Sequence, residues 1–364
     1  MFTTTFWRDN YMSHPYKFMD NKAFWKRAVA SSFENQDLIH NAPYLKEGDK
    51  FGSAGSCFAG NIIPYLEAAG FEYIRHNNSL NKGAISYDEN FNYHLFSAGY
   101  GNLYTAQHLL QIIEEAMGIK KPVVDRWYTS SGIVDPYRPG LKYLASCDVE
   151  FDLLKKDYLR SILSAFTEMD VFVFTLGLTE AWVCEIDDTV FPACPGTISG
   201  KFDPSIHKFK NYTVTEITTS MNAAFSLLRE INPELKIIVT VSPVPLVATA
   251  TNNHVVTATT YSKSVLRVAA EEICQKLPYV KYFPSYEIVT GPQAPFSYFE
   301  QNRRDVSKEA IDAVMEVLVS SCGNSSNKRE GEIPVSAKPK PSGNSVSLSE
   351  GLANVECEEA AADI

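Results

Sequence analysis

The stretch FGSAGSCFAGNIIPYLEAAGF, residues 51–71, predicts a short strand, a glycine-containing turn and a helix. KFGSAGS, residues 50–56, has the length of a strand with its turn, and apolar residues then recur at helical spacing. Pro64 lies inside this helical pattern, where it fits only in the first turn of a helix or at a kink. Ser56 and Cys57 therefore stand side by side where a strand gives way to a helix.

The same alternation of strand and helix continues along the chain. Three further apolar runs have the length and the residue types of buried strands, at residues 170–178, 236–244 and 280–289. Helical patterns flank these runs, at residues 151–169, 213–233, 261–278 and 307–321. Alternating helices and strands predict parallel strands with crossover helices on both faces. We therefore expect an α/β protein, a three-layer α/β/α sandwich with a mainly parallel, flavodoxin-like sheet.

Composition divides the chain of 364 residues into three parts. Residues 1–45 are rich in aromatic residues without a clear period, and we expect them to form a segment packed on the body. Residues 46–322 form the α/β body. Residues 323–364 contain no aromatic residue and are rich in Ser, Pro, Lys and Glu, so we expect a disordered tail.

Charge and cysteine content narrow the classes of function. The formal net charge is −10 without a cluster of Lys and Arg, which counts against binding to nucleic acid or anionic lipid. No apolar run predicts membrane insertion, and the N-terminus lacks the pattern of a secretory signal. Seven scattered cysteines without CxxC spacing favour reduced thiols in a cytoplasmic protein and no zinc site. Neither a nucleotide-binding motif nor another metal motif is present, so we expect no cofactor and no metal.

Polar residues follow the predicted strands, at the edge where functional groups gather in parallel sheets. Ser56 and Cys57 stand at the start of a helix, where free N–H groups and the helix dipole would lower the pKa of a thiol. The alternative is structural, since serine often caps helices and cysteine is often a small buried apolar residue. Thr179 and Glu180 offer a donor and a carboxylate, although such a pair can also cap a helix. A third strand end leads through a polar loop to His254.

Aromatic and charged residues in the neighbouring loops are candidates for substrate binding. Together with Glu180, we expect the following residues to contact a substrate: Trp127, Tyr137, Arg138, Trp182, Tyr286 and Asp305. Aromatic rings and cationic groups can hold a sugar or an acidic substituent. The alternative is that the Trp and Tyr side chains anchor long loops by packing.

The pentapeptide GSCFA at residues 55–59 resembles the signature of the GSCFA-domain family, which is related to the SGNH or GDSL hydrolase superfamily. Further blocks look like those of the family in the expected order: YGNLYTAQHLLQ, FTLGLTEAW, VSPVPLVAT, YSKSVLR and YFPSYEIVTG. The resemblance covers residues 45–320 and implies an SGNH-like sandwich similar to the one predicted above.

The resemblance also implies roles for individual residues. SGNH enzymes carry a nucleophilic serine third in a Gly-Asp-Ser turn, and Gly55-Ser56-Cys57 places Cys57, and not Ser56, at that position. The backbone N–H of Cys57 together with Asn102 and Thr179 would hold an oxyanion, since Thr179 lies where the superfamily has an asparagine.

The last block departs most from the superfamily. Residues 302–305, Asn-Arg-Arg-Asp, stand where SGNH enzymes have Asp-x-x-His, and no histidine follows His254. Among the seven histidines, His207 and His254 are the better candidates for a base, and we favour His254 because its loop leaves the expected active edge. Two hypotheses follow. The first is an esterase or acyltransferase acting on a carbohydrate or a small acylated metabolite, and the second is a non-catalytic ligand-binding protein.

Overall fold

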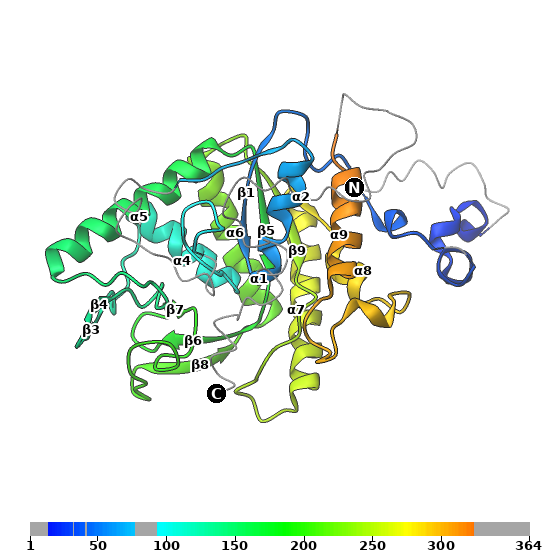
Figure 1. The fold of residues 1–364 in the computed structure, drawn as a ribbon. Helices are drawn as coiled ribbons and strands as arrows, with labels where there is room; N and C mark the ends of the chain where they lie inside the picture. Colours follow the sequence, from blue (N-terminus) through cyan, green and yellow to red (C-terminus); the bar gives the residue numbers. More distant parts are fainter. Residues whose placement is uncertain (1–13, 32, 41, 77–92, 324–364) are drawn as a thin grey trace, which may run out of the picture.

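The computed structural model describes residues 14–31, 33–40, 42–76 and 93–323, with a five-stranded parallel sheet at the centre (Figure 1). Its strands lie in the order β10-β9-β5-β1-β2. Their bounds are β1 Lys50–Gly55, β2 Glu72–Tyr73, β5 Val171–Leu176, β9 Lys236–Val241 and β10 Val280–Tyr282. Numbered along the chain, this order is 2-1-3-4-5, the order of flavodoxin-like folds. The expected three-layer α/β/α sandwich is confirmed.

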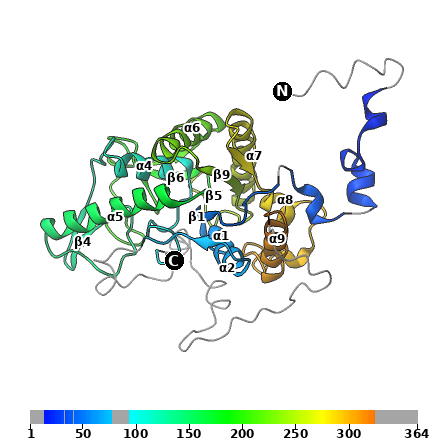
Figure 2. The same ribbon diagram turned by 90° about the horizontal axis from the view of Figure 1, so that it is seen from above.

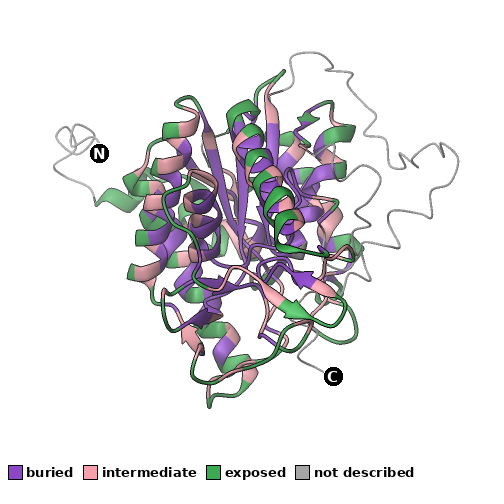
Figure 3. Cartoon of the chain, turned by 90° about the vertical axis from the view of Figure 1, so that its left-hand side faces the viewer, coloured by how far each residue is buried: buried purple, intermediate pink, exposed green. Residues whose placement is uncertain are grey.

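Helices cover both faces of the sheet (Figure 2). One face carries α4 Ala106–Ala116, α5 Asp148–Glu168, α6 Val214–Ile231 and α7 Val255–Lys276. The other face carries α1 Cys57–Gly60, α2 Ile62–Ala68, α8 Ser285–Thr290 and α9 Lys308–Ser320. Alternate residues of β5 explain the two layers, because Phe172 and Phe174 pack against the first group while Val171 and Val173 pack against the second. Figure 3 shows the central strands buried between helices with exposed outer surfaces.

The helix expected after β1 is interrupted. It forms α1 and α2 with Asn61 between them, and Pro64 is the third residue of α2. A proline tolerates this position because the first N–H groups of a helix have no partner within it. Of the two alternatives expected for Pro64, a first turn or a kink, the structure shows the first turn of a helix, and the expectation of one continuous helix is wrong.

The strand expected over residues 280–289 is correct only for its first part. β10 ends at Tyr282, and α8 begins at Ser285 after the cap residue Pro284. Proline has no N–H to donate to a neighbouring strand, so Pro284 cannot continue the pairing of β10 with β9. The hydroxyl of Ser285 instead donates to the carbonyl of Val241, at 3.0 Å.

Smaller sheets stand beside the central one. β6 Glu180–Cys184, β7 Val190–Phe191 and β8 His207–Asn211 form an antiparallel sheet in the order β7-β6-β8, and β3 Trp127–Thr129 pairs with β4 Gly132–Val134. Because β6 begins at Glu180, the alternative in which Thr179 and Glu180 cap a helix is wrong.

The N-terminal segment contacts the core of the body only near its end. None of residues 14–31 is buried, whereas Tyr44 and Leu45 pack into the core beside α9. The hydroxyl of Tyr44 donates to the carbonyl of Tyr282, at 2.8 Å. The expected tail falls almost wholly outside the described residues, so the domain boundaries at 45 and 323 remain predictions.

Candidate functional site

Strands β1 and β5 end side by side. They pair in parallel with Gly55 opposite Thr175, so Ser56 and Gly177 follow at the same edge of the sheet. A Cβ atom added to Gly177 would lie 3.3 Å from the Cβ of Ser56 and 3.2 Å from the ring and the carbonyl oxygen of Tyr104. Only glycine allows this approach without displacing its neighbours, so Gly177 sets the distance between the two turns.

The loop before α4 ties these two turns together. The N–H of Leu103 donates to the carbonyl of Gly55 at 2.8 Å, and the N–H of Gly177 donates to the carbonyl of Tyr104 at 3.0 Å. Gly101 enters this loop with φ of 70°, a left-handed conformation that favours glycine. The loop places the fully buried Asn102 beside the turn that carries Ser56.

Three buried hydroxyl groups in this region have no hydrogen-bond partner among the described residues: those of Ser56, Thr175 and Thr179. A buried polar group without a partner costs roughly 1–3 kcal/mol. Such groups are uncommon in folded proteins, and these three lie at two adjacent strand ends, where a bound ligand could accept hydrogen bonds from them.

Thr179 is held through its backbone. Its N–H donates to the hydroxyl of Ser262 at 3.1 Å, and its carbonyl accepts from the N–H of Tyr212 at 2.8 Å. Only the side-chain hydroxyl of Thr179 is therefore left to act as a donor to an oxyanion.

Lys263 also reaches this edge of the sheet and is not among the residues expected there from the sequence. Its ammonium group donates to the carbonyl of Gly177 at 2.7 Å, and the residue is 2% exposed. The signal was present in the helical pattern, since Lys263 shares the buried face of α7 with Leu266 and Ala270. A charged residue at such spacing indicates a buried partner.

The structure weakens the helix-dipole argument for Cys57. The side chain of Cys57 lies outside the described part of the chain, so its predicted role stays a prediction. Its helix α1 has only four residues, and a short helix has few aligned peptide dipoles. Ser56 is the N-cap residue, but its side chain accepts no cap hydrogen bond, so a capping role is not what holds Ser56 in place.

The two candidate bases have other partners. His254 is exposed at the N-cap of α7, where its Nδ1 accepts from the N–H of Val256 at 3.2 Å. The Nδ1 of His207 accepts from the N–H of Asp203 at 3.0 Å, and burial lowers the pKa of this histidine. Within the described residues, neither imidazole forms a hydrogen bond with Ser56.

Glu180 links β6 to the loop after β9. Its carboxylate accepts from the hydroxyl of Thr249 at 2.7 Å and from the N–H of Ala250 at 3.3 Å. Burial raises the pKa of Glu180, while these two hydrogen bonds act in the opposite direction. Glu180 therefore holds two strand-end loops together directly beside Thr179.

The aromatic candidates pack within the smaller sheets. Trp127 and Tyr137 both stack on Phe191, with ring centroids 5.9 and 5.7 Å apart. Trp182 makes an edge contact with Phe209, at 5.8 Å. These contacts match the alternative in which aromatic residues anchor loops. Trp127 and Trp182 are only partly buried, and their role in binding stays a prediction.

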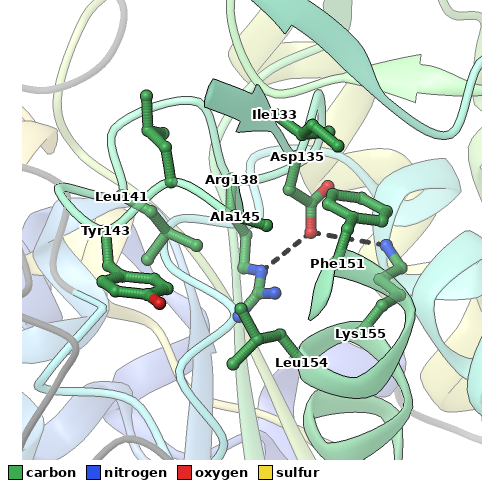
Figure 4. Close-up of a pocket in the computed structure, with 10 residues that line it drawn as sticks. Ile133, Asp135, Arg138, Leu141, Tyr143, Ala145, Phe151, Leu154 and Lys155 are labelled. Atoms are coloured by element: carbon green, nitrogen blue, oxygen red, sulfur yellow. Dashed lines mark hydrogen bonds and ion pairs between the residues drawn. The ribbon is translucent and has the colours of Figure 1, made fainter. Parts of the chain in front are cut away.

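Arg138 belongs to a buried ionic cluster (Figure 4). Its Nε donates to the carboxylate of Asp135 at 3.0 Å, and its guanidinium lies 3.6 Å from the ring centroid of Tyr158. Lys155 approaches the same carboxylate at 3.5 Å. The adjoining cavity measures about 30 Å³, which suits water molecules rather than a sugar.

The two remaining candidates lie near α8 and α9. Asp305 accepts hydrogen bonds from Asn302 at 2.7 Å and from Arg304 at 3.2 Å within its own loop. Tyr286, in α8, is half-buried against the core. No hydrogen bond joins either of them to Ser56 in the described parts of the chain.

Two classes of feature are not found in the described residues. No group of three or more His, Cys, Asp or Glu side chains is placed to hold a metal ion there. Likewise, within those ranges every helix is too short or too polar to cross a bilayer.

Comparison with known proteins gives one match by sequence. The sequence model of the GSCFA family matches residues 50–318, and no curated protein matches the chain. Among solved structures, one similar chain comes from the crystal structure of a carbohydrate esterase family 2 enzyme plus carbohydrate-binding domain from Corynascus thermopiles (Myceliophthora fergusii). The two share 13% identity over 78% of this chain and 66% of that one, with a TM-score of 0.29. This chain thus spans just under two thirds of that structure.

Proposed function

This chain belongs to the GSCFA family, and from that premise we propose that it is an SGNH-like esterase or acyltransferase. The observation that carries the proposal is the group of buried, unpartnered hydroxyls of Ser56, Thr175 and Thr179 at the ends of β1 and β5. A tetrahedral oxyanion is a ligand that would complete such a set of donors. Cys57 follows Ser56 directly, so its backbone lies at the same turn.

In the proposed reaction, the thiolate of Cys57 attacks the carbonyl carbon of an ester. A C–S bond forms, and the carbonyl π pair moves to the oxygen, which accepts hydrogen bonds from Asn102 and Thr179. Collapse of this intermediate breaks the C–O bond, and the departing alcohol takes a proton from the base, His254. Water or an acceptor hydroxyl then attacks the thioester and gives its proton to the base, which releases the acid or a new ester and restores the thiolate.

The proposed substrate is an acylated carbohydrate or another small acylated metabolite. Trp127 and Trp182 are only partly buried, which supports this choice, because aromatic faces pack well against sugar rings. The edge of the sheet that carries Ser56 connects to Trp182 through Thr179 and the first residues of β6.

A second candidate function is ligand binding without catalysis. It is favoured by the absence, in the described residues, of a hydrogen bond between an imidazole and Ser56, and by the engagement of His254 with its own helix. In that case the unpartnered hydroxyls would hold a polar ligand that is not cleaved.

Hydrolysis of aryl acetates by the purified chain tests the first candidate. We expect Cys57→Ala to lower kcat/KM on the order of 100-fold or more, because the covalent route is lost. Cys147→Ala is the control, since Cys147 is an exposed free cysteine at the N-cap of α5. If Cys57→Ala and Ser56→Ala both hydrolyse aryl acetates with the kcat/KM of the wild type, the assignment of the nucleophile to this turn is wrong. Absence of turnover together with stabilisation by acylated sugars in thermal-shift assays favours the binding protein.

A further inference from the structure

The ammonium group of Lys263 is buried at the edge of the sheet that carries Ser56. Lysine is one of the residues least often found inside proteins, because removing a charge from water is costly unless it is paired or hydrogen-bonded. Lys263 is 2% exposed, and its Nζ donates to the carbonyl oxygen of Gly177 at 2.7 Å. The proposed mechanism does not yet use this charge.

Helix α7 holds the turn after β5 through two consecutive residues. Lys263 donates to the carbonyl of Gly177, and the hydroxyl of Ser262 accepts from the N–H of Thr179. The same turn contacts Ser56 on its other side, where a Cβ on Gly177 would lie 3.3 Å from the Cβ of Ser56. Gly177 thus lies between the ammonium group of Lys263 and the turn that carries Ser56 and leads into Cys57.

The short helix α1 makes such a cation important. Four residues supply only a small dipole, so the positive potential expected at Cys57 needs another source. A fixed charge in a water-poor environment acts more strongly on a neighbouring anion than a charge in bulk water. It favours the ionised form of a nearby thiol and an oxyanion alike.

We propose that Lys263 is the positioning residue of this site: it fixes the Gly177–Thr179 turn and supplies the positive charge that stabilises the anions formed beside Ser56 and Cys57. The inference rests on the proposed function for its second part, the charge. Its first part, the hold on the turn, stands on the hydrogen bonds of α7 alone.

Other titratable groups meet at the same edge and act on the same potential. Glu180 begins β6 and opposes ionisation of a thiol as a like charge, and Tyr104 contacts Gly177 from the loop before α4. His254 is the N-cap residue of α7, the helix that also carries Lys263. Each of these groups is unchanged in the variants that test the proposal, so their contributions cancel in the comparison.

Hydrogen exchange tests the hold on the turn without reference to activity. In the full chain, we expect Lys263→Met to speed amide exchange of the peptide covering residues 175–181 about tenfold, because the carbonyl of Gly177 loses its partner. Lys263→Arg keeps charge and donors and should restore slow exchange. Unchanged exchange in Lys263→Met, or faster exchange spread over the whole body, contradicts the positioning role.

Alkylation of Cys57 by iodoacetamide between pH 6 and 9, mapped by mass spectrometry, tests the charge. We expect the midpoint to rise by about one pH unit in Lys263→Met and to stay in place in Lys263→Arg. Ser262→Ala is the matched control, because it removes a neutral hydrogen bond to the same turn. A midpoint that is equal in all four proteins shows that the charge has no role.

The same data separate this inference from the proposed function. If Cys57 in the wild-type chain reacts as slowly as the buried thiol of Cys322, the proposed function loses its nucleophile and the charge role fails with it. The exchange experiment then still decides whether Lys263 holds the turn.

Discussion

Gly177 and Ser56 come so close that a Cβ atom on Gly177 would lie 3.3 Å from the Cβ of Ser56. Side chains rarely approach at this distance, so one of the two strand-end turns would have to shift. The contact joins the turn after β5 to the turn that carries Ser56 and leads into Cys57, the proposed nucleophile. Small changes at Gly177 therefore act directly on the candidate site.

The first prediction concerns Gly177→Ala. The new methyl group meets Tyr104 at 3.2 Å and Ser56 at 3.3 Å, and part of this contact is with backbone. We expect the free energy of unfolding in urea to fall by about 1–3 kcal/mol. Gly60→Ala is the control, since its methyl group would meet only the end of the Leu95 side chain at 3.2 Å. Equal losses of unfolding free energy in the two variants would show that the turns at Ser56 and Gly177 are no more rigid than the surroundings of Gly60.

The second prediction concerns Thr179→Val, which removes a buried hydroxyl that has no partner. Stability should stay the same or rise by up to about 1 kcal/mol, because an unpaired polar group is replaced by an apolar one. Ester hydrolysis should fall on the order of 100-fold if the hydroxyl serves the oxyanion. As a control, Thr105→Val should destabilise the chain by about 1 kcal/mol, since Thr105 caps α4 through the N–H of His108. Loss of stability in Thr179→Val would argue that its hydroxyl is structural.

The layers of the fold were predictable from short-range patterns. Residues of β5 and β9 are buried on both faces, which makes each strand a continuous apolar run, and the crossover helices show the matching period. The error at residues 280–289 has a local cause, because Pro284 ends the strand and the apolar run continues into α8. An apolar run does not by itself distinguish a strand from a helix.

The candidate site was predictable only where it follows a strand end. That rule identified Ser56 and Thr179, whereas Thr175 looks like an ordinary β-branched strand residue and Lys263 like part of an amphipathic helix. The partner of Lys263 lies 86 positions away along the chain, and no local pattern encodes such a contact. The stacking of Trp127 on Phe191 is also a contact between distant positions, so the sequence could not separate a binding ring from a packing one.

The third prediction concerns the end of the body. A chain that ends at Gly323 should melt within about 2 °C of the full chain, because the residues beyond it lack the aromatic side chains needed to dock. A chain that ends at Ser321 should melt about 2–4 °C lower, since it loses the buried Cys322 and the hydrogen bond from Gly323 N–H to the carbonyl of Leu45, at 2.8 Å. Calorimetry of the three chains measures both shifts. A large drop on cutting after Gly323 would mean that the tail packs on the body.

The fourth prediction concerns His108, which is buried in α4. Burial, aided by Lys155, lowers its pKa to about 4. The native state therefore binds fewer protons than the unfolded state between pH 6.5 and 4, so His108 should contribute a loss of roughly 3 kcal/mol as the pH falls through this window. Denaturation at several pH values should show a shallower loss in His108→Gln. Parallel curves for the wild type and His108→Gln would contradict the prediction.

The last prediction decides whether Arg138 binds substrate or supports the fold. Asp135 is buried between Arg138 and Lys155, and these two cations hold its pKa below the usual value against the effect of burial. Lys155 also pairs with Glu115 at 3.2 Å, so Asp135→Asn removes one of the carboxylates of this buried cluster, and we expect the free energy of unfolding to fall by about 3–5 kcal/mol. Asp148→Asn is the control, because it breaks an ion pair with Arg126 in which Asp148 is exposed, and exposed pairs contribute little to stability. Below the melting transition of each variant, KM for aryl acetates should equal that of the wild type if Arg138 is structural. A changed KM in Asp135→Asn, with unchanged stability, would return Arg138 to the set of substrate-binding residues.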